Sequence, residues 1–436
     1  MMSRNRHRCR YSFAAFAANC LCAWLTCGTP TLHAADAAKK AENAAAKPAV
    51  SDVTTLSLKE CLAIACERQP NLRAARASHA ASEAGYRGIM NLSPLAARLS
   101  PDVPVRREQA AKGLLVSQAE IQKVEAENVY DVTRMYFTYV YARQQELTAT
   151  EFIEQMEVFY KIAEDLVKEG AQQDLNQFSL FRMEDGIAKV KRPRITAQTG
   201  QLLSLAALKE AMGVDQSYAF IPRDTELPVM SGSLTQQDVV ALAMARRPEL
   251  VQASAGVDAF RLEIQAQCKI KYRQAVPTLA VGSDLHSRTV PAALRNGEYR
   301  PGALAPEMPA TLAGKREDRV ARATELSVRQ DVLLEKTREL VQLEAVNAFL
   351  NWHSASKKVE LAKGRFETGK KMVQLSRENA AVIKKYDVLI LNEALAAESQ
   401  AEYLETVYEQ LKALTSLERV TAGGVKPAFP SLEIAR

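Results

Sequence analysis

A duplicated segment constrains this chain more than any other feature. Residues 56–72 read LSLKECLAIACERQPNL and residues 234–250 read LTQQDVVALAMARRPEL, so each position of the second copy lies 178 after its counterpart. Apolar residues fall mostly opposite apolar residues, and Pro70 matches Pro248. Self-similarity over so long a period predicts a fold built from two copies of one supersecondary unit.

The duplicated segment carries a helix start in both copies. Glu60 follows Ser57 by three residues, and Asp238 follows Thr235 by the same spacing. This is the spacing of a capping box, in which the hydroxyl accepts a hydrogen bond from the N3 amide and the acid reaches back to the cap amide. We therefore expect a helix to begin just after Ser57 and another just after Thr235.

A second match lies further along the chain at a different separation. Residues 130–137 match residues 343–350, and Asp174 matches Asp387, all at a separation of 213. The separations of 213 and 178 differ by 35, so the second copy carries about that many extra residues between its first and its later helices. The two copies are therefore unequal.

Long helices account for most of each copy. Residues 110–169 and 316–382 contain no proline and few glycines, and their apolar residues recur at three- and four-residue spacing. At about 1.5 Å per residue each run would extend roughly 90–100 Å, which favours helical hairpins over a compact globule. A heptad-like seam, typical of a bundle or coiled-coil edge, is formed by Leu333, Leu340, Leu343 and Leu350.

Each long helix is expected to turn back at a tip. The turns fall at residues 170–174 and 383–387, and the returning helices at residues 175–212 and 388–421. Pro193 lies inside the first returning helix and is expected to kink or interrupt it, because proline has no amide hydrogen to donate. A short strand is expected around residues 218–221, in the connector between the two copies.

The N-terminus has the pattern of a secretory signal. Residues 4–10 contain four arginines, residues 13–25 are mostly apolar, and cleavage is expected after Ala34. The apolar stretch is shorter than the about 20 residues that a membrane-spanning helix needs. Without residues 1–34, the 57 basic and 51 acidic residues become 53 and 51, so the net charge falls from +6 to +2. This small excess, with no clustered basic surface, argues against nucleic-acid binding.

Residue types that carry chemistry are sparse in the remaining chain. Cys61, Cys66 and Cys268 are interpreted as buried apolar fillers, and the first two would point about 140° apart on a helix, which argues against a disulfide between them. The five histidines show no metal-ligand spacing, and no nucleophile elbow or glycine-rich phosphate loop is present in the sequence. We therefore expect no catalytic, cofactor-binding or metal site, and no enzyme.

Taken in order, these segments resemble the TolC-like outer-membrane efflux family. Residues 56–72 and 234–250 resemble the start of each family repeat, residues 387–389 resemble the element after the periplasmic turn, and residues 417–424 resemble the end of the second repeat. The resemblance covers about residues 54–424. It implies a homotrimer whose helices form a periplasmic tunnel and whose strands form one shared barrel in the outer membrane. It also implies an adaptor and an inner-membrane pump as partners, and passive conduction rather than chemistry.

The chain departs from the family pattern where each repeat would insert two membrane strands. The second copy has room for a β-hairpin at residues 276–313, where residues 278–286 alternate in polarity. The first copy has only residues 91–105, with three prolines, which is too short for two strands of about 9–11 residues each. We hypothesise a divergent member with reduced membrane insertion. Another chain could complete the barrel, the protein could be a periplasmic tunnel or tip, or it could have left channel function.

The hairpin tips are the candidate sites of gating and of partner contact, because family members close their tunnel and meet their adaptors there. The candidate residues are Lys168, Glu169, Asp174, Lys384, Lys385, Tyr386 and Asp387. The alternative is a solvated turn in which Asp174 and Asp387 are helix N-caps.

Two further groups have structural interpretations. A solvated face near the start of the second long helices would consist of Arg106, Arg107, Lys315, Arg316 and Arg319. A packed helix–helix contact would consist of Tyr136, Phe137, Tyr139 and Tyr141.

The sequence as a whole predicts a mainly α fold of long coiled-coil-like helical hairpins from two internal repeats, with a short β-hairpin portion too small to complete a barrel alone. The expected parts are a signal peptide (1–34), a flexible leader (35–53), a first helical repeat without its membrane hairpin (54–213), a connector (214–232), a second helical repeat (233–424) with a β-hairpin at 276–313, and a tail (425–436).

The expected function is that of an exported tunnel component, at the outer membrane and in the periplasm of a Gram-negative-type cell, that passes substrates from a pump and adaptor. The alternative is a non-conducting periplasmic coiled-coil scaffold or adaptor-like interaction protein. An adaptor would show one coiled-coil hairpin rather than two copies, so the duplication favours the channel. The missing strands favour the scaffold.

Overall fold

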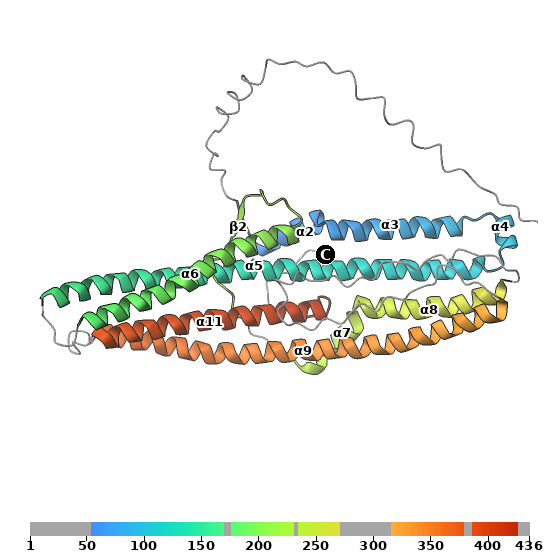
Figure 1. Ribbon diagram of the computed structural model, residues 1–436. Helices are drawn as coiled ribbons and strands as arrows, with labels where there is room; N and C mark the ends of the chain where they lie inside the picture. The colour runs from blue at the N-terminus through green and yellow to red at the C-terminus, as the bar shows by residue number, and fades with distance from the viewer. Residues whose placement is uncertain (1–53, 170–175, 231–233, 271–314, 379–385, 426–436) are drawn as a thin grey trace, which may run out of the picture. The chain divides into compact units, whose positions relative to one another are not determined.

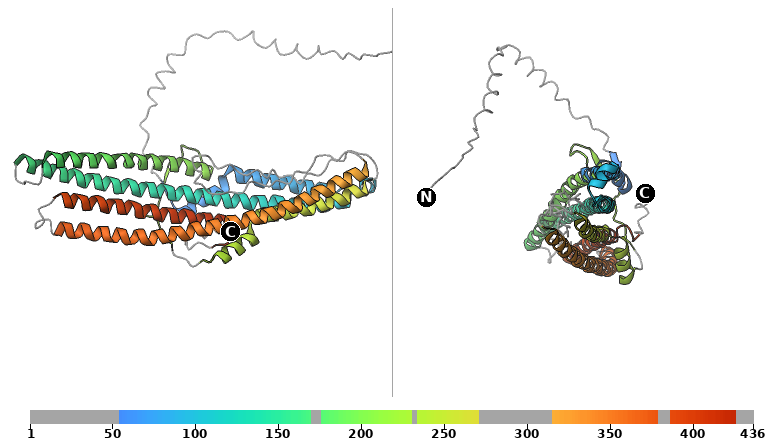
Figure 2. Two further views of the ribbon diagram at one scale, coloured as in Figure 1. Left: turned by 60° about the horizontal axis from the view of Figure 1, so that its bottom comes forward. Right: turned by 90° about the vertical axis from the view of Figure 1, so that its right-hand side faces the viewer.

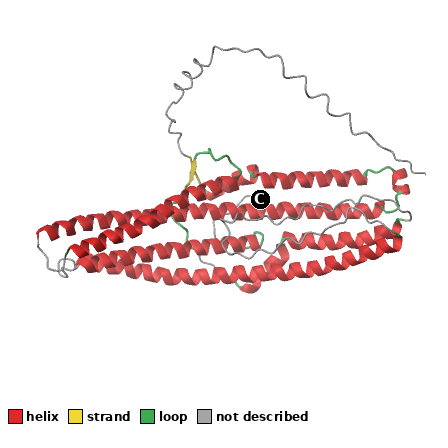
Figure 3. Cartoon of the chain, in the orientation of Figure 1, coloured by secondary structure: helices red, strands yellow, loops and turns green. Residues whose placement is uncertain are grey.

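Long helices dominate the described part of the chain, as the cartoon in Figure 3 shows. The computed structural model describes residues 54–169, 176–230, 234–270, 315–378 and 386–425. The first copy contains β1 (Thr54–Leu56), α2 (Leu58–Arg68), α3 (Pro70–Met90), α4 (Pro94–Leu99), α5 (Val103–Glu169) and α6 (Gln177–Met212), followed by β2 (Phe220–Pro222). The second copy contains α7 (Gln236–Arg246), α8 (Pro248–Lys269), α9 (Arg316–Glu378) and α11 (Tyr386–Val420). The prediction of a mainly α fold with long hairpins is confirmed.

The long helices of residues 54–425 lie side by side in a row, parallel to α5 and α9 (Figures 1 and 2). A section across the row meets four helices, both near the tips and near the other end. Toward the tips, α6 packs on α5, α5 on α11, and α11 on α9. Toward the other end, α3 packs on α5, α5 on α8, and α8 on α9. Helices α3 and α6 therefore form one edge of the row, and α9 forms the other edge along its whole length.

The two copies begin alike. Ser57 caps α2 in a complete capping box, in which Glu60 accepts from the amide of Ser57 at 2.7 Å. Thr235 caps α7 by accepting from the amide of Asp238 at 3.2 Å, and the Asp238 carboxylate accepts from the Thr235 hydroxyl at 2.6 Å. In both copies the following proline becomes the first residue of the next helix, where its missing amide hydrogen costs nothing.

The two copies also close alike. Gln69 and Arg247 each precede that proline, and each is buried. The side-chain amide of Gln69 donates to the carbonyl of Ala211 at 3.1 Å, and the guanidinium of Arg247 donates to the carbonyl of Val420 at 3.4 Å. The start of each copy is thus tied to the end of its last helix, as expected for a duplicated unit.

The central core gathers side chains from both copies. Leu58 and Cys61 from α2, Tyr136 from α5, Leu208 from α6 and Leu411 from α11 are all at most 1% exposed. A second cluster lies further toward the tips, where α5 and α6 pack together, and consists of Phe152, Ile153, Met156, Ala163, Leu180, Met183 and Ile187.

Two short strands pair between the ends of the first copy. β1 pairs in parallel with β2, with Thr55 opposite Ile221. The sequence predicted a strand near residues 218–221 but not its partner. Three residues carry too little periodicity to be recognised.

Three predictions about single features need correction. Pro193 does not interrupt α6, which is continuous from Gln177 to Met212 because it packs on α5 to either side of the proline. Only Cys61 of the three cysteines is buried; Cys66 and Cys268 are half-buried, and all three are free thiols. Burial raises the pKa of the Cys61 thiol to about 12, so this side chain behaves as an apolar filler.

The leucine seam of α9 does not face the core. Leu343 and Leu350 are 47% and 50% exposed, while the buried face holds no leucine and is rich in alanine. The core-facing residues include Val341, Ala345, Ala348, Trp352, Ala355 and Val359.

The connection between α3 and α5 is described in full and is helical rather than extended. Residues 91–93 form a turn, α4 follows, and no strand occurs among residues 91–102. The proposed β-hairpin of the second copy, residues 276–313, lies outside the described residues.

Candidate functional site

The first tip retains two of its candidate residues in the described structure. Lys168 and Glu169 form the exposed end of α5, and the Lys168 ammonium pairs with Glu164 at 2.9 Å. This hydrogen bond raises the pKa of Lys168. Asp174 lies outside the described residues.

The cap of α6 differs from the prediction. Asn176, rather than Asp174, is the N-cap, and its side chain accepts from the amide of Ser179 at 3.1 Å. At the second tip, Tyr386 and Asp387 form the start of α11, so Asp387 lies in the first turn of the helix rather than at its cap. Lys384 and Lys385 lie outside the described residues. Asn and Asp are about equally favourable N-caps, so residue type alone does not distinguish position 176 from position 174.

A polar cavity of about 410 Å³ lies between α5, α9 and α11, behind the second tip. The Arg377 guanidinium pairs with the buried Glu393 at 2.7 Å across its wall, and the Lys370 ammonium lies 4.0 Å from the centre of the Phe366 ring. The side chains of Gln400 and Thr148 join α11 to α5 at 3.1 Å. The wall thus combines the Lys370 ammonium over a phenyl ring, an ion pair and side-chain amides. Such a lining suits binding or gating rather than bond-breaking chemistry.

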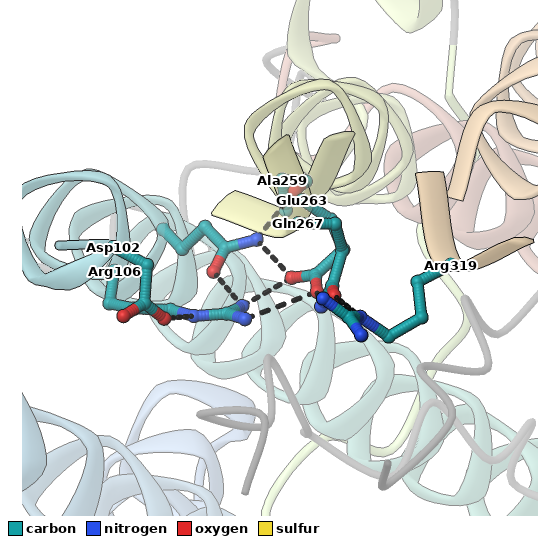
Figure 4. A network of polar contacts seen from close by, with 7 residues as sticks. Asp102, Arg106, Ala259, Glu263, Gln267 and Arg319 are labelled. Atoms are coloured by element: carbon teal, nitrogen blue, oxygen red, sulfur yellow. Dashed lines mark hydrogen bonds and ion pairs between the residues drawn. The ribbon is translucent and has the colours of Figure 1, made fainter. Parts of the chain in front are cut away.

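A buried ion network lies at the opposite end of the helices (Figure 4). Both terminal nitrogens of Arg106 donate to the carboxylate of Glu263, the second at 3.1 Å, and its Nε donates to Asp102 at 3.1 Å. The three side chains are at most 4% exposed. The network therefore joins the start of α5 to the end of α8.

Amide side chains complete this network. Gln109 donates to Glu263 and to the carbonyl of Ala259, both at 2.9 Å, and Gln267 donates to Glu263 at 2.6 Å. Arg319 at the start of α9 donates to Gln267 and to the carbonyl of Ile270 at 3.0 and 3.1 Å. The network thus holds the start of α5, the end of α8 and the start of α9 together.

The carboxylate of Glu263 stays charged despite its burial. Burial by itself raises the pKa of this group, but the hydrogen bonds and charge of Arg106, together with the two amides, outweigh it and lower the pKa below its usual value. Removal of one partner from such a pair leaves an uncompensated buried charge.

The interpretation of the basic residues as a solvated face was wrong for Arg106 and Arg319, which are 3% and 4% exposed. Arg107 is half-buried and donates to the carbonyls of Ile89 and Met90 at 3.2 and 3.1 Å. Lys315 and Arg316 are exposed, as expected.

A second buried ion cluster lies near the middle of α9. Glu344 pairs with Arg247 of the second copy's first helices at 2.8 Å and with Arg419 of α11 at 2.6 Å. No sequence pattern indicates this cluster, since the three residues are far apart in the chain and have polar neighbours along it.

The aromatic group on α5 is packed, as predicted. Tyr141 stacks on Tyr408 of α11 with ring centres 4.5 Å apart, and Tyr136 meets Phe137 edge to face at 5.7 Å. The Tyr136 hydroxyl donates to the carbonyl of Leu56 at 3.3 Å and accepts from the amide of Asp224 at 3.2 Å. These rings hold the two copies together rather than line a ligand site.

Helix α9 has a second apolar face that the described residues leave exposed. Seven large side chains, 39–77% exposed, fall within about 80° around the helix axis and lie opposite its buried face. This outer stripe of α9 consists of Val328, Val332, Leu343, Leu350, Leu361, Met372 and Leu375. A helix that is apolar on two opposite sides is one that packs on two partners.

Helix α6, at the other edge of the row, has a similar surface. Five large side chains, 60–71% exposed, fall within about 120° around its axis. This outer stripe of α6 consists of Phe178, Phe181, Ile195, Leu202 and Leu203.

The described residues hold no cluster of His, Cys, Asp or Glu suited to a metal ion. Across the same ranges, every helix is too short or too polar to cross a membrane.

Two unequal copies of a helical hairpin unit thus lie side by side, in a row of four helices with apolar outer edges. The chain has a TolC-like fold. The open-state outer membrane channel MtrE of Neisseria gonorrhoeae matches with a TM-score of 0.64 and 16% identity, over 86% of this chain and 94% of that one. CmeC, the outer membrane channel of Campylobacter jejuni, matches with a TM-score of 0.64 and 11% identity, over 84% and 86% of the two chains.

The outer membrane protein VceC of Vibrio cholerae is also similar, with a TM-score of 0.63 and 12% identity over 84% of this chain and 96% of that one. The sequence itself matches no family model and no curated protein. At identities this low, the structural similarity establishes the fold alone. The function is therefore argued from the chain's own residues.

Proposed function

We propose that this protein is an exported tunnel component of an efflux system, assembled as a head-to-tail homotrimer. The observation that carries the proposal is the pair of outer stripes on α9 and α6, at opposite edges of the row of helices. Two different surfaces that cover each other between copies form a heterologous contact, which closes into a ring when the rotation allows it.

The two stripes match in level as well as in character. Counted from the tips, Leu361 lies 17 residues before Glu378 and Ile195 lies 18 residues after Gln177. Leu375 and Phe181 lie 3 and 4 residues from the same helix ends. At about 1.5 Å per residue, the two members of each pair lie within about 1.5 Å of the same distance from these helix ends.

Burial of ten side chains provides ample driving force: the five of the α6 stripe and the five of the α9 stripe, from Leu343 to Leu375, that fall within the length of α6. At about 1–2 kcal/mol for completing the burial of each, one interface gains roughly 10–20 kcal/mol before the cost of association is subtracted. The acidic, basic and amide residues between the stripes would remain solvated at the outside of the ring or face its lumen.

Similar structures bear the name of outer membrane channels, which supports the same location and task for this chain. A tunnel of this kind conducts passively and receives its substrates from a periplasmic adaptor and an inner-membrane pump. The proposed gate and adaptor contact are the hairpin tips, with Lys168, Glu169, Asp174, Lys384, Lys385, Tyr386 and Asp387. The short connection after α3 supports the proposal that the first copy lacks its membrane hairpin.

Conductance across planar phospholipid bilayers tests the proposal. Purified trimer should give discrete conductance steps, and Asp387→Lys should raise the open fraction if like charges then repel at the tip. Lys363→Ser, an exposed position of α9 outside both the tip and the outer stripe, is the matched control for gating. A folded trimer that never conducts would contradict the tunnel and favour the non-conducting scaffold.

A further inference from the structure

The connection between α3 and α5 presents an unusual surface at the end of the helices. Leu95 and Leu99, one turn apart on α4, are 69% and 78% exposed, and Met90 and Leu92 beside them are 43% and 40% exposed. These four apolar side chains and Arg98 together form the α4 surface. We propose that the α4 surface rests on an anionic phospholipid membrane, as an interfacial contact in the place where a membrane hairpin would leave the bundle.

The charge around the α4 surface suits anionic headgroups. Between Glu83 and Asp102 the sequence has no acidic residue, and Arg87 and Arg98 in that interval are both exposed. Asp102 is 3% exposed and its carboxylate is bound by Arg106, so it contributes no free negative charge to the surface. Exposed leucines flanked by arginines are the composition of segments that lie in a membrane interface.

The surface is held in place from beneath. Arg107 donates to the carbonyls of Ile89 and Met90, which fixes the end of α3 on α5. The amide of Val103 donates to the carbonyl of Ser100 at 3.1 Å, which joins α4 to the start of α5. The leucines are therefore held in position before any membrane contact is made, so binding loses little conformational entropy.

The position of the surface favours a lipid over another protein. It lies beyond the last turn of α3 and the first turn of α5, at the end where α8 also stops and α9 starts (Figure 1). The outer stripes of α6 and α9, which we assign to subunit contacts, lie along the sides of the helices. The start of α9 is electrically balanced, with Lys315 and Arg316 followed by Glu317 and Asp318, so the cationic character comes from the α3–α4 side.

A tryptophan placed in the α4 surface tests the contact directly. In Leu95→Trp, added vesicles of phosphatidylethanolamine and brominated phosphatidylglycerol should quench most of the new emission. The matched control is Val229→Trp in the connector after β2, where the native side chain is 53% exposed and no quenching is expected. Wild-type protein gives the background of Trp352, since Trp24 lies in the expected signal peptide.

A second variant guards against an effect of the tryptophan itself. Leu95→Ser combined with Leu99→Ser should weaken vesicle binding by about tenfold, since two exposed leucines no longer enter the interface. Replacing phosphatidylglycerol by phosphatidylcholine should weaken wild-type binding as well.

Equal quenching of both tryptophans, or none of Leu95→Trp, would overturn the inference. So would a Leu95→Trp emission already shifted to the blue in the vesicle-free trimer, because a neighbouring chain or residues 271–314 would then cover the surface. The inference rests on the proposed membrane location but not on conduction. A conducting trimer without quenching refutes this contact alone, and a quenched trimer without conductance refutes the tunnel alone.

Discussion

Replacing Glu263 by alanine should destabilise the protein more than any change at a surface ion pair. Glu263 is 2% exposed and accepts from both terminal nitrogens of Arg106, from Gln109 and from Gln267. The variant leaves the guanidinium buried with Asp102 as its remaining charged partner. Breaking a buried pair on one side costs about 3–5 kcal/mol, and the retained Asp102 contact places the expected loss near 3 kcal/mol.

Glu263→Gln separates charge from shape. It keeps one acceptor oxygen and the packing volume but removes the negative charge, so about half of the loss, roughly 1–2 kcal/mol, is expected. The control is Glu398→Ala, since that carboxylate is 66% exposed and lies 3.8 Å from Arg365. An exposed pair of this kind contributes about 0–1 kcal/mol.

Denaturant titration followed by the fluorescence of the buried Trp352 measures these losses. A loss near 3 kcal/mol corresponds to roughly a hundredfold change in the unfolding equilibrium constant. A loss below about 1 kcal/mol for Glu263→Ala, or equal losses for alanine and glutamine, would refute the account of the network.

Three further predictions address other parts of the fold. The pKa of Glu263 in the folded protein is lowered from 4.5, so its carboxylate contributes its full stabilisation above about pH 4.5 and loses it as the pH falls through the folded pKa. The difference in unfolding free energy between wild type and Glu263→Ala should therefore be constant above about pH 4.5 and should shrink in acid. Gly213 has φ of +67°, and an added Cβ would lie 2.7 Å from the Cα of Gln69. Gly213→Ala should therefore destabilise the protein by more than the about 1–2 kcal/mol of a left-handed residue. In the same titration Gly88→Ala, which meets open space on α3, should stabilise it by about 0.5–1 kcal/mol. Ser57→Ala should cost about 1 kcal/mol through the lost cap of α2, and a loss no larger than that of Ser254→Ala in mid-helix would contradict the capping role.

The sequence was sufficient for the features that local chemistry determines. The capping residues Ser57 and Thr235, the prolines that begin α3 and α8, and the long proline-free runs of α5 and α9 each follow from a short pattern. The α9 helix was expected over residues 316–382; it begins at Arg316 and is described as far as Glu378, and residues 379–382 lie outside the described residues.

Burial and partnership could not be predicted in the same way. Arg106 lies 157 residues from Glu263, and a basic residue near a helix start is ordinarily solvated, so only the packing of α5 on α8 reveals its role. On α9, leucine periodicity identified an apolar stripe but not which of two stripes faces the core. The inward stripe is rich in alanine because helices approach closely there, while the leucines face outward.

Subunit order within the proposed ring is the most direct test of the central claim. Ile195→Cys on α6 and Leu361→Cys on α9, combined in one chain and oxidised, should join neighbouring copies, since a disulfide forms when the Cα atoms lie about 4.4–6.8 Å apart. The control replaces Leu361→Cys by Lys363→Cys, two residues away and about 200° around the helix. A denaturing gel should show covalent dimers and trimers and then stop, while each single variant and the control remain monomeric. A ladder that continues past three copies, or cross-linking as strong in the Lys363→Cys control, would contradict a closed head-to-tail trimer.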